Sequence, residues 1–261
     1  MSVVSVDISR KTYPRGMGGD EQVSLNGLRF SASEGEFVCL VGPSGCGKTT
    51  ILNLACGLDT AFDGEILIDG RRPPTGAKVG YMFQTPRLLP WLTVRDNVDL
   101  VLADSDGNDP RTNSLLGAMG LAEFAQSYPG RLSGGMQRRV ALARAFVTNP
   151  GLLLLDEPFL SLDAPVANRL RQLLLDLYGG RPATVLFVTH DLREALFLAD
   201  RILFLSHRPG RVVFDLVVDL QRPREPDGPE IERLRLQLLR RHPDLLAGLV
   251  RPAEETDTSA M

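Results

Sequence analysis

The stretch Gly42-Pro43-Ser44-Gly45-Cys46-Gly47-Lys48-Thr49 decides the fold that this sequence predicts. It follows a short apolar run at residues 37–41, which is typical of a buried parallel strand, and it precedes residues 50–54, which favour a helix. Glycines let the backbone turn tightly, so successive N–H groups converge on phosphate oxygens, and the new helix directs its unpaired donors to the same point. The sequence therefore predicts a phosphate-binding loop between a strand and a helix.

Two side chains at the end of this loop carry the predicted chemistry. Lys48 is expected to reach the β and γ phosphates of a nucleotide, and the Thr49 hydroxyl is expected to bind Mg²⁺. A glycine-rich turn that matches by chance is the alternative, but the strand and the helix on either side argue against it. The candidate nucleotide contacts in this stretch are Gly42, Pro43, Ser44, Gly45, Cys46, Gly47, Lys48, Thr49 and Thr50.

The composition limits the class of protein. The chain has 261 residues, of which 43% are hydrophobic and 23% charged, as is ordinary for a soluble globular protein. A formal net charge of -3 shows no basic surplus, so we expect no nucleic-acid partner. No apolar run approaches the roughly 20 residues that span a bilayer, and the first residues lack the pattern of a signal peptide.

Three cysteines lie close together at Cys39, Cys46 and Cys56. Their odd number and their position around the loop predict reduced thiols in a cytosolic protein. Because Cys46 lies in a loop rich in backbone donors, we expect its thiolate to be favoured. Alkylation of Cys46 should then inactivate the protein, and bound nucleotide should protect it.

Acidic and imidazole side chains follow two further apolar runs. Four leucines at residues 152–155 favour a central parallel strand, and Asp156 and Glu157 come directly after it, where ligands of open α/β sheets bind. We expect Asp156 to hold the Mg²⁺ shell and Glu157 to orient or polarise the attacking water. His190 follows the apolar run at residues 184–189. A lone histidine is usually structural, but its position after the same kind of strand favours a functional role.

A second helix start suited to an anion lies at residues 132–137. Ser133 is a good N-cap, and Gly134 and Gly135 keep the approach to the following helix open. In isolation an ordinary serine-capped helix with a flexible approach would be the favoured interpretation of this stretch. Its place shortly before the acidic pair favours the functional interpretation, and the candidate residues are Ser133, Gly134, Gly135 and Gln137.

The remaining segments predict the domain organisation. Residues 1–36 alternate apolar and polar positions, which indicates antiparallel strands, and residues 88–145 are mainly helical. Tyr13 lies beside a proline and either stacks on a nucleobase or is an incidental loop tyrosine. Residues 221–230 predict a linker, and residues 232–241 a basic helix that packs on the domain or faces a partner or a membrane. The tail from Arg251 is predicted to be disordered.

To about residue 220 the chain resembles the ATP-binding subunit of an ABC transporter, on motifs that occur in the family's order. Residues 42–49 are similar to the Walker A loop, Gln84 to the Q-loop glutamine, residues 132–137 to the signature, Asp156 and Glu157 to Walker B with its catalytic glutamate, residues 161–163 with Asp163 to the D-loop, His190 to the switch histidine, and Tyr13 to the adenine-stacking aromatic. The resemblance implies an α/β fold of the P-loop NTPase class, with a RecA-like mostly parallel core sheet. It also implies an N-terminal antiparallel β subdomain and an inserted helical subdomain.

The resemblance also implies a function. In this family two chains sandwich two ATP molecules head to tail, with Lys48, Gln84, Glu157 and His190 in catalytic positions and Thr49, Gln84 and Asp156 around Mg²⁺. The expected partners are integral membrane permease subunits and a periplasmic or lipoprotein solute-binding protein, with this chain on the cytoplasmic face of the inner membrane. Residues 88–98, 156–159 and 205–211 are similar to importers of nitrate, sulfonate, taurine and related solutes. Leu160 departs from the small residue that is commoner there.

Two other functions are less consistent with the sequence. A soluble ABC-type ATPase of DNA repair or translation should carry a second cassette, long coiled coils or zinc-binding cysteines, and this sequence has none of them. An interaction protein with an inactive site conflicts with the intact Lys48, Asp156, Glu157 and His190. The sequence therefore favours a transport motor, and the transported solute is not readable from it.

Overall fold

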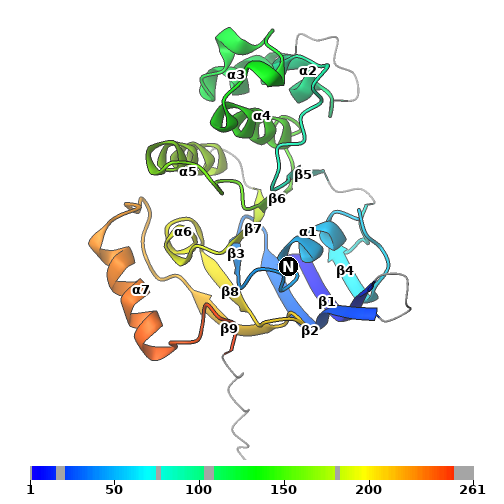
Figure 1. Ribbon diagram of the computed structural model, residues 1–261, viewed down its shortest axis with the longest axis vertical. Coiled ribbons are helices and arrows are strands. Elements are labelled where there is room, and N and C mark those ends of the chain that lie inside the picture. The colour runs from blue at the N-terminus through cyan, green and yellow to red at the C-terminus, as the bar shows by residue number, and fades with distance from the viewer. Residues whose placement is uncertain (1, 16–20, 75–77, 103–108, 180–182, 250–261) are drawn as a thin grey trace, which may run out of the picture.

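Two β-sheets and a separate group of helices make up the protein (Figure 1). The computed structural model describes residues 2–15, 21–74, 78–102, 109–179 and 183–249. Within these ranges no helix combines the length and the apolar character needed to cross a membrane. The tail from Arg251, predicted to be disordered, lies outside the described residues.

The larger sheet has six strands in the order β5-β6-β7-β3-β8-β9, parallel except for β9, which runs antiparallel to β8. Its central strands β3, β6 and β7 are buried along their whole length, which is why their sequences are continuous apolar runs. This sheet confirms the predicted mostly parallel core. The strands are β3 (Phe37–Val41), β5 (Val79–Met82), β6 (Leu152–Asp156), β7 (Thr184–Thr189), β8 (Arg201–Leu205) and β9 (Val212–Val217).

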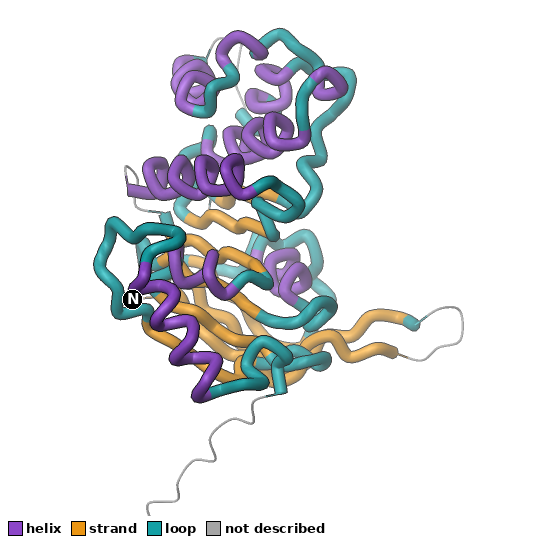
Figure 2. The backbone as a smooth tube through the Cα atoms, turned by 60° about the vertical axis from the view of Figure 1, so that its left-hand side comes forward, coloured by secondary structure: helices purple, strands orange, loops and turns teal. Residues whose placement is uncertain are grey.

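The smaller sheet is antiparallel, with the order β2-β1-β4, as the alternating N-terminal pattern predicts. Val6 pairs with Phe30 on one side and with Ile66 on the other, and these three side chains are buried on one face of the sheet. Figure 2 shows the far ends of two of these strands extending beyond the body of the protein. The strands are β1 (Ser2–Pro14), β2 (Glu21–Ser33) and β4 (Asp63–Ile68).

Helices α5 (Ala164–Gly179) and α6 (Leu192–Leu198) connect strands of the larger sheet, and α1 (Lys48–Ala55) leads from β3 of that sheet to β4 of the smaller one. Helix α1 contacts β6 and β7, and α6 contacts β3 and β7. Because β3, β6 and β7 run parallel to one another, the turns that follow them all lie at the carboxyl edge of the sheet. This edge brings together the loop at residues 42–47, the acidic pair and His190.

The helical group between β5 and β6 lies apart from the sheets at one end of the protein (Figure 1). Its longest helix contacts β5 and so joins the group to the larger sheet. Thr93 forms a capping box with Asp96 at the first helix of the group. The elements are α2 (Val94–Asp99), α3 (Pro110–Ala118), the 3-10 helices η2 (Ala122–Phe124) and η3 (Pro129–Arg131), and α4 (Gly134–Phe146).

The C-terminal segment packs on the domain. Helix α7 (Pro229–Arg241) contacts α6, and the Arg193 guanidinium of α6 lies 2.8 Å from the Glu232 carboxylate of α7. Before α7, Arg224 donates hydrogen bonds to the carbonyls of Leu196 and Ala199 at the end of α6, at 2.9 and 2.6 Å. Leu245, after α7, is completely buried. The segment predicted as a linker and helix therefore covers α6 in this structure.

Candidate nucleotide-binding site

The phosphate-binding loop has the predicted strand–loop–helix order. Gly45 and Gly47 adopt positive φ angles of 74° and 106°, and a Cβ at Gly47 would lie 2.5 Å from the Leu25 side chain. Only glycine meets both requirements at Gly47 without displacing a neighbour. The helix α1 begins at Lys48, so its unpaired backbone donors lie at the loop.

The Lys48 ammonium lies against its own loop in this structure. Its Nζ donates hydrogen bonds to the carbonyl oxygens of Gly42 at 2.8 Å and Pro43 at 3.0 Å. The side chain is only 6% exposed, and these carbonyls compensate the burial of its charge. The ammonium is thus held at the loop that would surround a phosphate group.

Thr49 and Asp156 meet across the carboxyl edge of the sheet. The Thr49 hydroxyl donates a 2.8 Å hydrogen bond to Asp156 Oδ2. Burial raises the pKa of the Asp156 carboxyl, while the Thr49 hydrogen bond acts in the opposite direction. Hydroxyl and carboxylate oxygens are ligands that Mg²⁺ prefers, and Mg²⁺ is usually held by one or two carboxylates together with substrate phosphates. The pair therefore fits a magnesium ion that arrives with a nucleotide.

Glu157 has an unusual backbone conformation, which sets the direction of its side chain. Its φ angle is 43°, in the left-handed region that non-glycine residues rarely adopt, and its N–H still donates to the Val188 carbonyl at 3.0 Å. The carboxylate lies at the wall of the cavity beside the loop, and His190 Nδ1 lies 3.4 Å from Glu157 Oε2. The structure thus brings together the acid and the histidine that the sequence places on separate strands.

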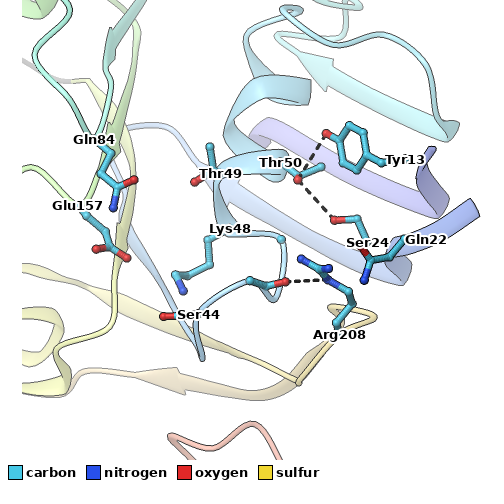
Figure 3. Close-up of a pocket in the computed structure, with 12 residues that line it drawn as sticks. Tyr13, Gln22, Ser24, Ser44, Lys48, Thr49, Thr50, Gln84, Glu157 and Arg208 are labelled. Atoms are coloured by element: carbon cyan, nitrogen blue, oxygen red, sulfur yellow. Dashed lines mark hydrogen bonds between the residues drawn. The ribbon is translucent and has the colours of Figure 1, made fainter. Parts of the chain in front are cut away.

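A cavity of about 350 Å³ is lined by nine of the nineteen predicted site residues (Figure 3). Asp156 and His190 do not line it, but they contact the lining residues Thr49 and Glu157. Tyr13 lies at one end, where its hydroxyl donates to Asp59 Oδ2 at 3.0 Å, and Glu157 and Gln84 lie at the other. The volume falls within the range of small-molecule sites, about 300–1,000 Å³. The lining residues are Tyr13, Gln22, Ser24, Ser44, Gly45, Gly47, Lys48, Thr49, Thr50, Gln84, Glu157 and Arg208.

Arg138 of α4 connects the helical group to this cavity. Its NH1 donates to the Gln84 carbonyl at 3.2 Å and to the Pro158 carbonyl at 3.0 Å. Pro158 follows Glu157 directly, so one guanidinium bridges the segments that carry the cavity's glutamine and glutamate. Movement of α4 relative to the sheet would act on both.

The stretch at residues 133–137 lies outside the cavity lining. Ser133 is exposed and caps α4 by accepting a hydrogen bond from the Met136 N–H at 3.3 Å. Gln137 Nε2 donates to the Pro129 carbonyl at 3.1 Å, within its own loop. Asp163 lies outside as well, and its carboxylate accepts from the Val166 N–H at 3.2 Å at the start of α5. These predicted nucleotide contacts are not joined to the cavity within one chain.

The expectation for Cys46 is wrong. Its thiol is 1% exposed, and burial raises the pKa of the Cys46 thiol more than the nearby Lys48 lowers it. The Cys46 side chain packs inward, where a Cβ at Gly42 would lie 3.0 Å from Sγ. The thiol is therefore the favoured form, and Cys46 is a packing residue in this structure.

Three lining residues are not among the predicted site residues: Gln22, Ser24 and Arg208. The first two lie on β2, and Arg208 lies in the turn after β8. A signal for Arg208 exists in the sequence. The apolar run at residues 201–205 is a strand, and turns after neighbouring parallel strands lie at the same edge of a sheet.

Comparisons with known proteins agree with this geometry. Residues 25–160 match the family described as ABC transporter. The aliphatic sulfonates import ATP-binding protein SsuB 2 of Burkholderia cenocepacia is 44% identical over 238 residues, 91% of this chain and 86% of that protein. The aliphatic sulfonates import ATP-binding protein SsuB of Bacillus thuringiensis subsp. konkukian is 42% identical over 218 residues, 82% of this chain and 86% of that protein.

A solved structure shows the same fold. The dimeric post-hydrolysis state of the ATP-binding cassette MJ0796, bound to ADP and Pi, superposes with a TM-score of 0.73 and 32% identity, covering 84% of this chain and 100% of that one. Both the family match and the identity of the relatives reach well beyond the phosphate-binding loop, which many unrelated ATPases share. This chain therefore belongs to the ABC transporter family, as one of its ATP-binding cassettes.

Proposed function

We propose that this cassette hydrolyses ATP as a head-to-tail homodimer and thereby drives the import of a small solute through separate membrane subunits. The observation that carries the proposal is a divided site. Lys48, Thr49 and Glu157 line the cavity and Asp156 is hydrogen-bonded to Thr49, while the helix start at Ser133 lies outside the cavity. In this proposal the cavity of one chain is completed by the helix start at Ser133 of a second chain.

Within one chain the residues have distinct proposed roles. Lys48 would exchange its loop carbonyls for the β and γ phosphates, and the Thr49 hydroxyl and Asp156 carboxylate, with Gln84 nearby, would hold Mg²⁺. Bound there, Mg²⁺ neutralises charge that develops on the phosphoryl oxygens. The Glu157 carboxylate would accept the proton of the attacking water, and His190, 3.4 Å away, would orient that carboxylate and the γ-phosphate.

The second chain would supply the missing donors. The exposed helix start at Ser133, with Gly134 and Gly135 behind it, would meet the γ-phosphate held by the partner. Asp163 and Gln137 would lie at the same interface. Tyr13 would stack on the adenine at the far end of the cavity.

The names of the relatives, which are import ATP-binding proteins, support a proposal for the partners. We propose that permease subunits dock at the helical group, on the cytoplasmic face of the cell membrane, and that a solute-binding protein delivers the solute. Because the relatives are import proteins for aliphatic sulfonates, we propose a sulfonate or a similar small solute such as taurine or nitrate. These relatives argue against a cassette of DNA repair or translation.

Purification from membranes tests this proposal. Tagged Glu157→Gln protein, expressed in its native host, is extracted in mild detergent with ATP, and the co-purifying proteins are identified, with a Lys48→Ala variant in parallel. The proposal predicts a multi-span permease in both preparations. Vesicles that hold this permease together with the unsubstituted chain should take up a labelled sulfonate when supplied with ATP, and vesicles with Glu157→Gln should not. Recovery of ribosomes, DNA or only soluble proteins would overturn it.

A further inference from the structure

The turn after β8 carries an arginine into the cavity proposed for ATP. Arg208 lines this cavity beside Ser44 and Gly45. Its Nε donates a 2.9 Å hydrogen bond to the Gly45 carbonyl, and a Cβ at Gly45 would lie 3.3 Å from Arg208 NH2. The guanidinium therefore lies directly against the phosphate-binding loop.

The backbone around Arg208 is fixed to the loop and to the smaller sheet. Gly210 donates its N–H to the Ser24 carbonyl at 2.8 Å and accepts from the Asn26 N–H at 3.2 Å. A Cβ at Gly210 would lie 2.1 Å from the Cys46 carbonyl oxygen, so the turn touches the backbone of the phosphate-binding loop itself. This close approach holds Arg208 at a defined distance from the cavity.

Two further contacts hold the turn from within and from the other side. The Ser206 hydroxyl donates to the Pro209 carbonyl at 2.9 Å and accepts from the Arg211 N–H at 3.0 Å. The His207 N–H donates to the Gly248 carbonyl at 3.2 Å, in the segment after α7. The turn that carries Arg208 is therefore held by hydrogen bonds to β2, within the turn itself and to the segment after α7.

Arg208 uses fewer of its hydrogen-bond donors within the protein than Lys48 does. Only its Nε has a hydrogen-bond acceptor among the described residues, which leaves the donors on NH1 and NH2 for a ligand. Figure 3 shows Arg208 toward Gln22 and Ser24, and Lys48 on the opposite side, toward Ser44 and Glu157. The cavity lining thus carries a cation on each side of the loop.

We propose that Arg208 is a second phosphate-binding cation, which donates through NH1 and NH2 to the polyphosphate of the bound nucleotide. A guanidinium presents a planar pair of donors that matches two phosphate oxygens, whereas the Lys48 ammonium acts as a point charge. Arg208 stabilises bound ATP and ADP from the side of the loop opposite Lys48. This inference rests on the proposed ATP site.

Equilibrium binding of ATP and ADP to the purified full chain tests the proposal, at low and high salt with Mg²⁺. The variants are Arg208→Gln, which removes the charge, and Arg208→Lys, which keeps it without the fork. Arg211→Gln is the matched control, because Arg211 is an exposed arginine of the same turn that does not line the cavity. Lys48→Ala tests the site itself, and unfolding without nucleotide checks that each variant folds.

A hydrogen bond to a charged group contributes about 10- to 100-fold in binding, so Arg208→Gln should weaken ATP and ADP binding by about this factor. Its affinity should also depend less on salt, because one charge contact is lost. The nucleotide affinity of Arg208→Lys should lie between that of Arg208→Gln and that of the parent protein. The affinity of Arg211→Gln should equal that of the parent protein.

Two results would overturn the role of Arg208: ATP affinity in Arg208→Gln equal to the control, or a loss with unchanged salt dependence, which indicates loop distortion. If Lys48→Ala also binds ATP normally, the ATP site itself is wrong. The failure of the Arg208 proposal and that of the proposed function are thereby separated.

Discussion

At the scale of single residues, Asp156 combines two opposing demands. It must be charged to hold a cation, yet it is only 2% exposed and burial raises the pKa of its carboxyl. Above that raised pKa the ionised carboxylate costs the nucleotide-free protein stability. As the pH falls through the raised pKa, the native state takes up a proton and the cost disappears.

Asp156→Asn should therefore stabilise the nucleotide-free protein at pH 7 while abolishing Mg²⁺-dependent ATP hydrolysis. We expect a gain of about 0.5–2 kcal/mol in the free energy of unfolding, which shrinks toward zero as the pH falls to about 4. Urea unfolding across this range measures it. Asp176→Asn, an exposed acid on α5, is the control and should change little. A loss of stability in Asp156→Asn at pH 7 would refute the account of its burial.

Cys46 shows where a residue-scale prediction failed. The sequence places it in a loop rich in backbone donors, but it does not indicate that the side chain packs inward and is buried. We expect iodoacetamide to label Cys46 at least about tenfold more slowly than a cysteine in an unfolded peptide at pH 7, since a raised pKa depletes the thiolate. The labelling rate should keep rising with pH up to a higher pH than for a cysteine with an ordinary pKa, because the pKa of the Cys46 thiol is raised. Mass spectrometry of the labelled peptides decides, and fast labelling at pH 7 would restore the thiolate hypothesis.

At the scale of elements, Arg138 is the contact through which α4 reaches the cavity. Because its NH1 bridges the Gln84 and Pro158 carbonyls, Arg138→Met should misplace both segments and lower the rate of ATP hydrolysis about tenfold. ATP affinity should change little, since Arg138 does not line the cavity.

Arg139→Met is the matched variant on the same helix. Arg139 donates to the Met119 carbonyl at 2.6 Å inside the helical group, so its loss should reduce stability and leave turnover nearly intact. Turnover and ATP affinity measured side by side on both purified variants distinguish the two. Equal effects on turnover would mean that Arg138 only supports the helix.

The elements themselves were largely predictable. Continuous apolar runs predicted β3, β6 and β7, because strands buried on both faces exclude polar residues, and alternation predicted the antiparallel strands. The docking of α7 on α6 was left open, since a basic, leucine-bearing helix is equally suited to a partner. The docking depends on contacts between residues far apart in the sequence, such as the ion pair of Arg193 with Glu232. The spacing of residues in the sequence does not show such contacts.

At the scale of the whole molecule, the sequence predicted which segments meet but not every residue they bring. The common carboxyl edge of the parallel strands explains why Thr49, Asp156 and His190 converge. Arg208 was missed as a site residue because residues 205–211 entered the prediction only as a likeness to importers, although the order of strands in the sheet places this turn beside the loop. The roles of Ser133 and Asp163 remain predictions, since they concern a second chain.

The central claim is that one ATP is enclosed by two chains. The most direct measurement is the mass in solution, by analytical ultracentrifugation, of Glu157→Gln with and without saturating ATP, beside Glu157→Gln combined with Ser133→Arg. We predict that ATP converts Glu157→Gln from one chain to two, and that the added Ser133→Arg leaves ATP bound to a single chain, because its bulk blocks the helix start that covers the partner's nucleotide. A Glu157→Gln protein that stays monomeric at saturating ATP, or a dimer that Ser133→Arg does not disturb, would contradict the shared site.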